Sequence, residues 1–354
     1  MGYAKWMNLY FDLYYTLRHR FIKRYWIKVY QNRINNTVPF TKEQENMVTD
    51  FFAPYAKVSP VFHRVYYENT GHFSEKHLPI DLYFNVVDEY FNDIYEAKYL
   101  DNKCYYKKMF PGIRQPDYAV AKMGRFWFDE NDQLISYDKV KEIVSRESEL
   151  FLKAATESNG GKGVSYISAD QGDMVKQFEE FTCQGDWIAQ RPIRQHEAIS
   201  AVNESSVNTI RIVTLLCEDE VKVYSAIMRI GKKGSKCDNA SSGGITIGIT
   251  EDGKLKKYAH EYSGQRYDRH PSNDFVFEGY QVPSFDKAIE LVKKAHPMVP
   301  HFRLVSWDVC IAEDGEAVLM ETNLCKGGID IHEFNNGPLF GEDTKKILDE
   351  VFGK

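Results

Sequence analysis

Large apolar side chains recur every three or four positions through the first hundred residues, which is the spacing of a helix face. This spacing predicts one long amphipathic helix, Tyr3–Gln31, whose apolar stripe consists of Trp6, Tyr10, Tyr14, Leu17, Phe21 and Tyr25. Helical spacing continues over residues 41–98, and residues 80–95 predict a single helix that faces the core. We therefore predict a mainly helical N-terminal region over residues 1–100, which acts as scaffold.

The second half of the first predicted helix is crowded with cations, namely Arg18, Arg20, Lys23, Arg24 and Lys28. A basic amphipathic helix edged with tryptophan and tyrosine can lie in a membrane interface. It can equally dock on the body of the protein and leave its cations in solvent. We favour docking and keep a peripheral contact with the inner face of a membrane as the alternative.

Beyond residue 100 the pattern changes to short apolar runs separated by turns, which indicates strands. Strands are predicted at residues 118–123, 150–155, 164–168, 186–193, 208–215 and 221–229, and helices at residues 286–296 and 344–352. Residues 260–283 are polar and irregular, so we expect a loop that covers a site. This mixture predicts an α+β protein.

The length, net charge, cysteine spacing and apolar runs of the sequence limit the classes of protein to which the chain can belong. A chain of 354 residues is long enough for more than one domain, and its net charge of −6 favours no nucleic-acid partner. The six cysteines have no metal-ligand spacing, which indicates reduced thiols. No apolar run approaches the ~20 residues of a membrane span, and no signal peptide is evident, so we expect a cytoplasmic location.

The segment richest in candidate chemistry is a hairpin near the C-terminus, with strands at residues 305–311 and 317–323 and a tight turn at residues 313–316. Alternation along the strands places Asp308 on one face, with Glu321 and Asn323 together on the neighbouring strand. Two carboxylates and an amide oxygen suit Mg²⁺ when phosphates supply the remaining ligands. The alternative is an ordinary hairpin with a polar, solvated face.

A glycine-rich turn joins two of the predicted strands. It contains Ser158, Gly160, Gly161 and Gly163, and Lys153 precedes it on a strand. Backbone N–H groups of such a turn can approach phosphate oxygens, and a lysine fixed on a strand can reach the same group. The spacing is not that of a Walker A loop, and the alternative is a simple turn.

Two arginines interrupt otherwise apolar strands, Arg211 on one and Arg229 on the next. Buried guanidinium groups need anionic partners, because an unpaired buried charge is very costly. Those partners are either protein carboxylates or the phosphate or carboxylate of a ligand.

The order of these features resembles the ATP-grasp superfamily over residues 100–354. Four segments are most similar to sugar-transfer-associated ATP-grasp proteins, which occur with polysaccharide assembly and also resemble teichuronopeptide-type enzymes: residues 208–211, 238–244, 306–308 and 321–323. The resemblance implies two α+β lobes with ATP between them, a first lobe at residues 101–195 and a second at residues 196–354. Many relatives carry an arginine where this chain has Ser306 and an acidic hinge residue where it has Gln190 and Arg191.

Carried over by position, the resemblance implies ATP and Mg²⁺ as cofactors. The Mg²⁺ ligands are then Asp308, Glu321 and Asn323, and the phosphate contacts are Lys153, Lys103 and the flap of Ser158, Gly160, Gly161 and Gly163. The adenine lies against Gln190, Arg191 and Ile193. Arg211 and Arg229 contact the transferred phosphoryl group or the acceptor carboxylate.

The resemblance further implies an ATP-dependent carboxylate–amine ligase that works through an acyl phosphate. Its substrates would be a small or glycan-linked carboxylate and an amine such as an amino acid, in the modification of cell-surface polysaccharide. Two alternatives stay open, a phosphotransferase acting on a hydroxyl and a non-catalytic nucleotide-binding module. A kinase needs a general base, for which Asp238 is a weak candidate, since a turn role explains it as well.

Overall fold

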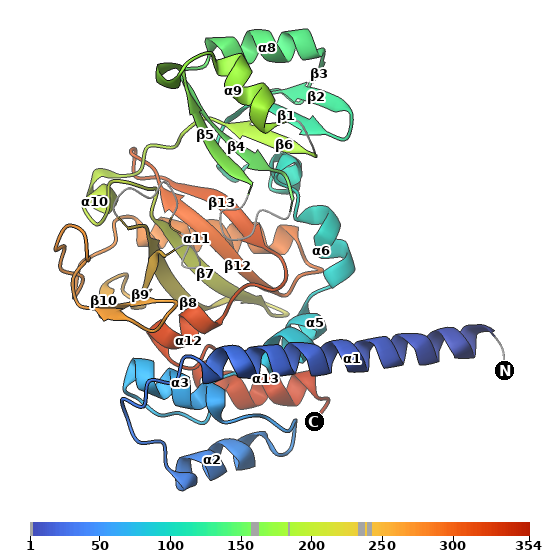
Figure 1. Cartoon of the computed structure of the whole chain (residues 1–354), viewed down its shortest axis with the longest axis vertical. Helices are drawn as coiled ribbons and strands as arrows, with labels where there is room; N and C mark the ends of the chain where they lie inside the picture. Colours follow the sequence, from blue (N-terminus) through green and yellow to red (C-terminus); the bar gives the residue numbers. More distant parts are fainter. Residues whose placement is uncertain (1–2, 157–162, 183–184, 233–237, 239–242) are drawn as a thin grey trace.

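The computed structural model describes residues 3–156, 163–182, 185–232, 238 and 243–354, with residues 3–16 described by their backbone. Helices occupy the N-terminal quarter, and two antiparallel sheets follow (Figure 1). This is the α+β arrangement predicted from the sequence. No helix of the described part of the chain is long and apolar enough to cross a membrane.

The N-terminal region begins with the long helix α1, Tyr3–Gln31, as predicted, and α1 packs on the third and fourth helices. A capping box at Thr41 and Gln44 starts the second helix. The remaining helices are short: α2 Lys42–Phe52, α3 Val61–Thr70, α4 Ile80–Leu82, α5 Asp88–Phe91, α6 Ile94–Leu100 and α7 Tyr106–Met109. A π-helical segment, Tyr83–Val87, joins α4 to α5.

The single helix predicted over residues 80–95 is wrong only at its C-terminal end. It ends at Phe91, and Asn92 is extended with φ −135° and ψ 134°. The Asn92 side chain hydrogen-bonds both the carbonyl (2.8 Å) and the N–H (3.0 Å) of Leu304 in the second sheet. Asp93 then caps α6 by accepting from the N–H groups of Tyr95 and Glu96. A tertiary contact therefore interrupts the helical spacing.

The first sheet has six strands in the order β3-β2-β1-β6-β4-β5. Helices α8, Tyr137–Arg146, and α9, Met174–Phe181, cover one face (Figure 1). The opposite face carries the candidate phosphate and adenine residues. The strands are β1 Tyr118–Met123, β2 Phe126–Asp129, β3 Leu134–Ile135, β4 Glu149–Ala154, β5 Val164–Ser168 and β6 Trp187–Gln190.

The second sheet has seven strands in the order β11-β10-β9-β8-β7-β12-β13. They are β7 Thr209–Leu216, β8 Val221–Ile230, β9 Ile245–Ile249, β10 Leu255–Glu261, β11 Arg266–Tyr267, β12 Leu304–Ile311 and β13 Ala317–Asn323. Helix α11, Phe285–Ala295, packs on one face, and α12, Asp330–Asn336, packs on the other. Helix α10, Glu197–Ser200, follows the hinge, and α13, Thr344–Val351, ends the chain.

The segment 260–283 is not the covering loop that its polarity predicted. Phe277 and Val282 are fully buried in the main core of the second sheet, and Tyr280 donates to the carbonyl of Ala198 at 2.7 Å. Although most residues of the segment are polar, its few aromatic side chains decide its position, because each of them buries a large apolar area. The segment therefore belongs to the scaffold.

Helix α12 joins the N-terminal region to the second sheet through Glu333, which is completely buried. Its carboxylate accepts hydrogen bonds from the N–H groups of Leu78 (3.1 Å) and Leu339 (2.9 Å) and also contacts the ring of His77. Three donors from two segments, residues 77–78 and Leu339, thus meet on one side chain. Such a buried carboxylate stabilises the fold only while every donor keeps its partner.

We expect Glu333→Ala to lower the free energy of unfolding by about 3–5 kcal/mol, because two backbone N–H groups and a histidine lose their acceptor. Glu342→Ala is the matched control, since Glu342 also links the two regions, through a surface ion pair with Lys76 at 2.6 Å. Its expected effect is below about 1 kcal/mol. Equal losses in chemical denaturation of the two variants would contradict this account.

Candidate functional site

The site is built on the hairpin of β12 and β13, which forms as predicted. In the strand register Asp308 lies opposite Glu321, and Ser306 lies opposite Asn323. Val305, Trp307, Val309 and Ile311 point into the main core, which leaves the alternate positions for the other face. The three predicted metal ligands therefore share one face of the sheet.

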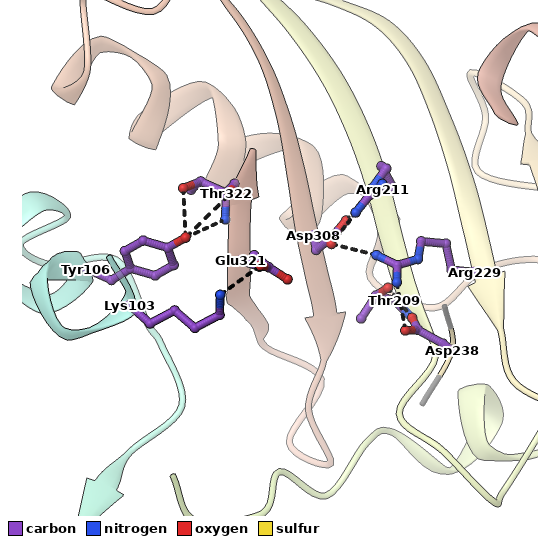
Figure 2. A network of polar contacts seen from close by, with 9 residues as sticks. All are labelled: Lys103, Tyr106, Thr209, Arg211, Arg229, Asp238, Asp308, Glu321 and Thr322. Carbon is purple, nitrogen blue, oxygen red and sulfur yellow. Dashed lines mark hydrogen bonds and ion pairs between the residues drawn. The ribbon is translucent and has the colours of Figure 1, made fainter. Parts of the chain in front are cut away.

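The Asp308 carboxylate is held by two arginines on neighbouring strands (Figure 2). Arg211, its register partner on β7, donates from Nε to Oδ1 and from Nη2 to Oδ2, both at 2.7 Å. Arg229 on β8 donates to Oδ2 at 2.6 Å. The bidentate geometry of Arg211 is the strong form of a guanidinium–carboxylate pair.

Arg229 has a second carboxylate partner, Asp238, whose Oδ1 lies 3.0 Å from Nη2. Asp238 also accepts from the N–H of Thr209 at 3.1 Å and contacts its hydroxyl group. The two arginines, Asp308 and Asp238 therefore form a charge-balanced network across three strands and a loop (Figure 2). Of the two predicted kinds of partner, the described residues supply protein carboxylates.

The electrostatics of the network hold Asp308 in its ionised form. Burial raises the pKa of this carboxyl group, but the charges of Arg211 and Arg229 outweigh burial and lower the pKa to about 2. Behind Arg211 lies His332 on α12, whose pKa is lowered to about 3 by burial and by the arginine charge. Its Nδ1 meets Ser225 Oγ at 2.8 Å, so a neutral ring backs the network.

Glu321 has its own cation, because Lys103 Nζ lies 2.9 Å from Glu321 Oε1 (Figure 2). Lys103 begins the short 3₁₀-helix Lys103–Tyr105 after α6, and its N–H donates to the carbonyl of Ala155 next to β4 at 2.9 Å. Tyr106 in the same segment hydrogen-bonds the backbone and hydroxyl of Thr322. The linker between the helical region and the first sheet is thus fastened beside the hairpin carboxylate.

The donor set fits a metal that is shared with phosphate. No group of three or more His, Cys, Asp or Glu side chains in the described residues could hold a metal alone. Mg²⁺ commonly takes one or two carboxylates and completes its shell with water and phosphate. In the described structure Nδ2 of Asn323 is buried without a partner. A half-turn of this amide would place its oxygen there, beside Glu321.

The small residue Ser306 is explained by the loop after β13. A Cβ atom at Gly327 would lie 2.6 Å from Ser306 Oγ, so the loop backbone approaches Ser306 closely. An arginine at this position would collide with that backbone. The positive charge beside Asp308 comes instead from the neighbouring strand, through Arg211.

The first sheet presents Lys153 and Gln190 on one face. Lys153 lies opposite Ile188 in the register of β4 and β6, and Phe151 lies opposite Gln190, so these four side chains share that face. Gly163 has φ +74°, and a Cβ there would lie 2.9 Å from Ala154 Cβ, so the hairpin needs glycine at this point. The candidates Ser158, Gly160 and Gly161 lie outside the described residues.

The hinge residues separate into two groups. The Arg191 side chain binds Glu147 (2.7 Å), which follows α8, and Glu130 (2.7 Å), which follows β2, so protein carboxylates already engage it. Ile193 packs instead against a small core cluster that contains Cys310 and Val318 of the hairpin. Cys310 is two positions from Asp308 on the same strand face, which connects the hinge to the charged network.

Beside Ile193 lies a cavity of about 610 Å³ between the first sheet and the segment after the hinge. Its lining includes aromatic side chains of β4 and β5 and carboxylates from β4, α10 and the turn after β12: Glu149, Phe151, Tyr166, Ile193, Glu197, Val207 and Glu313. Sequence reasoning identified only Ile193 among these. The others follow no motif, and only the facing of two sheets brings them together.

Comparison with known proteins identifies the family of this chain. A family model described as sugar-transfer associated ATP-grasp matches residues 87–347. No curated protein matches the chain.

Solved structures that resemble it include D-alanyl-alanine synthetase A from Vibrio cholerae, with TM-score 0.41, 13% identity and coverage of 75% of this chain and 65% of that one. An L-amino acid ligase from Bacillus licheniformis has TM-score 0.39, 14% identity and coverage of 71% and 48%. An ADP complex of an N5-carboxyaminoimidazole ribonucleotide synthetase has TM-score 0.40, 12% identity and coverage of 64% and 45%.

The matched region spans less than two thirds of the length of each of these solved proteins. At such TM-scores the structural likenesses carry no argument of their own. The family match, in contrast, covers well over half of the sequence and includes every residue of the hairpin site. The chain belongs to the sugar-transfer associated ATP-grasp family and has the ATP-grasp fold, preceded by a helical N-terminal region.

Proposed function

We propose that the protein is an ATP-dependent ligase that joins a carboxylate to an amine through an acyl phosphate. The observation that supports this most is the pair of guanidinium groups, Arg211 and Arg229, beside the hairpin carboxylates. Two fixed cations next to a phosphate site favour an anionic acceptor over a neutral alcohol.

The nucleotide would lie between the two sheets. We assign the adenosine to the cavity beside Ile193, where Phe151 and Tyr166 offer ring surfaces. The carboxylates of Glu149 and Glu197 line the same cavity and are suited to accept hydrogen bonds from ribose hydroxyl groups. Lys153 and Lys103 would then meet the phosphates at the end nearer the hairpin.

Asp308, Glu321 and Asn323 would hold Mg²⁺ together with the nucleotide phosphates. The metal supplies charge neutralisation for the phosphoryl group during transfer. In the described structure Asp308 is fully engaged by two arginines and Glu321 by Lys103. Binding of the metal and phosphates would therefore exchange ion pairs, with guanidinium groups turning from Asp308 toward phosphate or acceptor oxygens.

The reaction would proceed in two steps. A carboxylate oxygen of the acceptor attacks the γ-phosphorus, the bond to the β,γ-bridging oxygen breaks, and ADP leaves. The neutral amine then attacks the acyl carbon, and the bond from that carbon to the phosphate oxygen breaks. The nitrogen releases a proton as the amide forms, and phosphate departs with one oxygen from the original carboxylate. Arg211 and Arg229 would stabilise the acceptor and the acyl phosphate by position and charge, and no protein nucleophile is required.

The family description suggests the substrate class. An enzyme associated with sugar transfer would act on a sugar acid or another glycan-linked carboxylate, with an amino acid or a similar amine as second substrate. We place this reaction in the cytoplasm, in the modification of polysaccharide destined for the cell surface.

Glu321→Gln should lower turnover about 100-fold or more, because a metal carboxylate contributes about 3 kcal/mol where phosphate charge moves. Stability should change by about 1 kcal/mol, since the amide oxygen can still accept from Lys103. Glu316→Gln is the matched control, because Glu316 lies in the turn of the same hairpin and pairs with Lys287 at 2.5 Å. The turnover of both variants is measured as steady-state ADP release with saturating Mg²⁺. Equal turnover in the two variants would show that Glu321 is not a metal ligand.

The reaction class is tested with an acceptor carboxylate labelled with ¹⁸O. A ligase transfers one labelled oxygen to the released phosphate, which mass spectrometry detects. A phosphotransferase leaves the label in the organic product and esterifies phosphate to a hydroxyl group. The second result would replace the ligase with a kinase. In that enzyme Asp238 could act as base only after leaving Thr209 and Arg229.

A further inference from the structure

Helix α1 has two distinct faces over its described side chains, residues 17–31. One face docks on the protein, since Trp26 stacks on Phe84 with ring centroids 5.5 Å apart and Tyr30 is completely buried. Arg18 also turns inward, to Glu89 at 2.6 Å. Docking, the interpretation favoured from the sequence, therefore accounts for one side of the helix only.

The other face of α1 is exposed and combines apolar with basic side chains. Its exposed positions recur at intervals of three and four residues and form two adjacent rows, Leu17, Phe21, Tyr25 and Arg20, Arg24, Lys28. Leu17 is 55% exposed, Phe21 72% and Tyr25 54%. We call these six residues the outer face of α1. A stripe of three large apolar side chains on one helix exceeds the scattered single ones usual on soluble surfaces.

The cations of the outer face are available to a partner. None of Arg20, Arg24 and Lys28 forms an ion pair with a carboxylate within the part of the chain that the structure describes. The whole helix Tyr3–Gln31 contains a single acidic residue, Asp12. The molecule as a whole carries a net charge of −6, so the sign of this stripe is opposite to that of the overall charge.

We propose that the outer face of α1 binds the surface of an anionic lipid bilayer. Leu17, Phe21 and Tyr25 would enter the boundary between headgroups and acyl chains. The row of cations beside them would meet lipid phosphates and carboxylates. A second copy of this chain fits the same face poorly, because two identical basic rows would repel each other.

The position of the helix suits this role. In Figure 1, α1 crosses the end of the molecule that lies away from α8 and α9, among α2, α3 and α13, and its N-terminal half extends past these helices. Its backbone stays helical back to Tyr3, and the sequence keeps aromatic residues at the same spacing through Tyr14, Tyr10 and Trp6. A bilayer that meets the projecting part of the helix would therefore lie away from the first sheet.

Sedimentation with vesicles tests the proposal in the full-length protein. Wild type should bind vesicles of phosphatidylcholine with about one third phosphatidylserine, bind poorly to pure phosphatidylcholine, and dissociate as salt rises. The triple variant Arg20→Glu, Arg24→Glu, Lys28→Glu should bind at least 100-fold more weakly, since each cation near an anionic surface is worth about fivefold. Leu17→Ser with Phe21→Ser should also weaken binding.

The matched control reverses three cations of α8 at the far end of the molecule, Lys139→Glu, Lys141→Glu and Arg146→Glu, and should bind like wild type (Figure 1). Thermal unfolding and ATP turnover without vesicles should be unchanged in the α1 variants. Absence of binding by wild type, or equal binding by both triple variants, would overturn the proposal. So would a dimer in solution that the α1 substitutions dissociate.

Discussion

The bidentate pair between Arg211 and Asp308 is the interaction on which the candidate site depends. It joins β7 to β12 in the seven-stranded sheet, and Arg229 and Asp238 extend it to the central strand β8 and the loop beyond. Breaking a buried pair by removing one partner costs about 3–5 kcal/mol, because the other charge is left without compensation. The network therefore links three strands of the sheet through side chains and concentrates two cations and two carboxylates at one place.

The site lies between two apolar contacts on the same face of β12. Leu304 packs into the core shared with the N-terminal helices and α12, and Cys310 packs with Ile193 of the hinge. Asp308 lies between these contacts, so the helical region and the hinge approach it from opposite directions. Lys103, in the linker after α6, also lies beside the hairpin, where it pairs with Glu321. The linker that follows the helical region thus brings a cation to Glu321.

The parts predicted well from the sequence are those determined by local alternation. The helix Tyr3–Gln31, the strand Tyr118–Met123 and the return strand Ala317–Asn323 match the expected bounds, since apolar spacing and turn residues specify them. Prediction failed where distant residues decide. The helix break at Asn92 depends on Leu304, 212 positions away, and the carboxylate partner of Arg211 lies 97 positions away.

In the candidate site, too, the parts determined by local alternation were predictable and the contacts between distant residues were not. The hairpin faces, and with them Asp308, Glu321 and Asn323, follow from a period of two along each strand. The lining of the cavity could not be anticipated, because Phe151, Tyr166 and Glu197 carry no motif and meet only when two sheets face each other. Arg191 looked like a hinge contact, yet its side chain is held by Glu147 and Glu130.

Substitution of Asp308 cannot separate folding from function, because the same carboxylate serves the sheet and the proposed metal. The most direct test is a crystal structure with Mg²⁺ and a non-hydrolysable ATP analogue. The account predicts Mg²⁺ about 2.0–2.1 Å from oxygens of Asp308 and Glu321, with Asn323 in the same shell and at least one of the two arginines turned toward phosphate. A bound nucleotide whose metal avoids these residues, with both guanidinium groups still on Asp308, would contradict it.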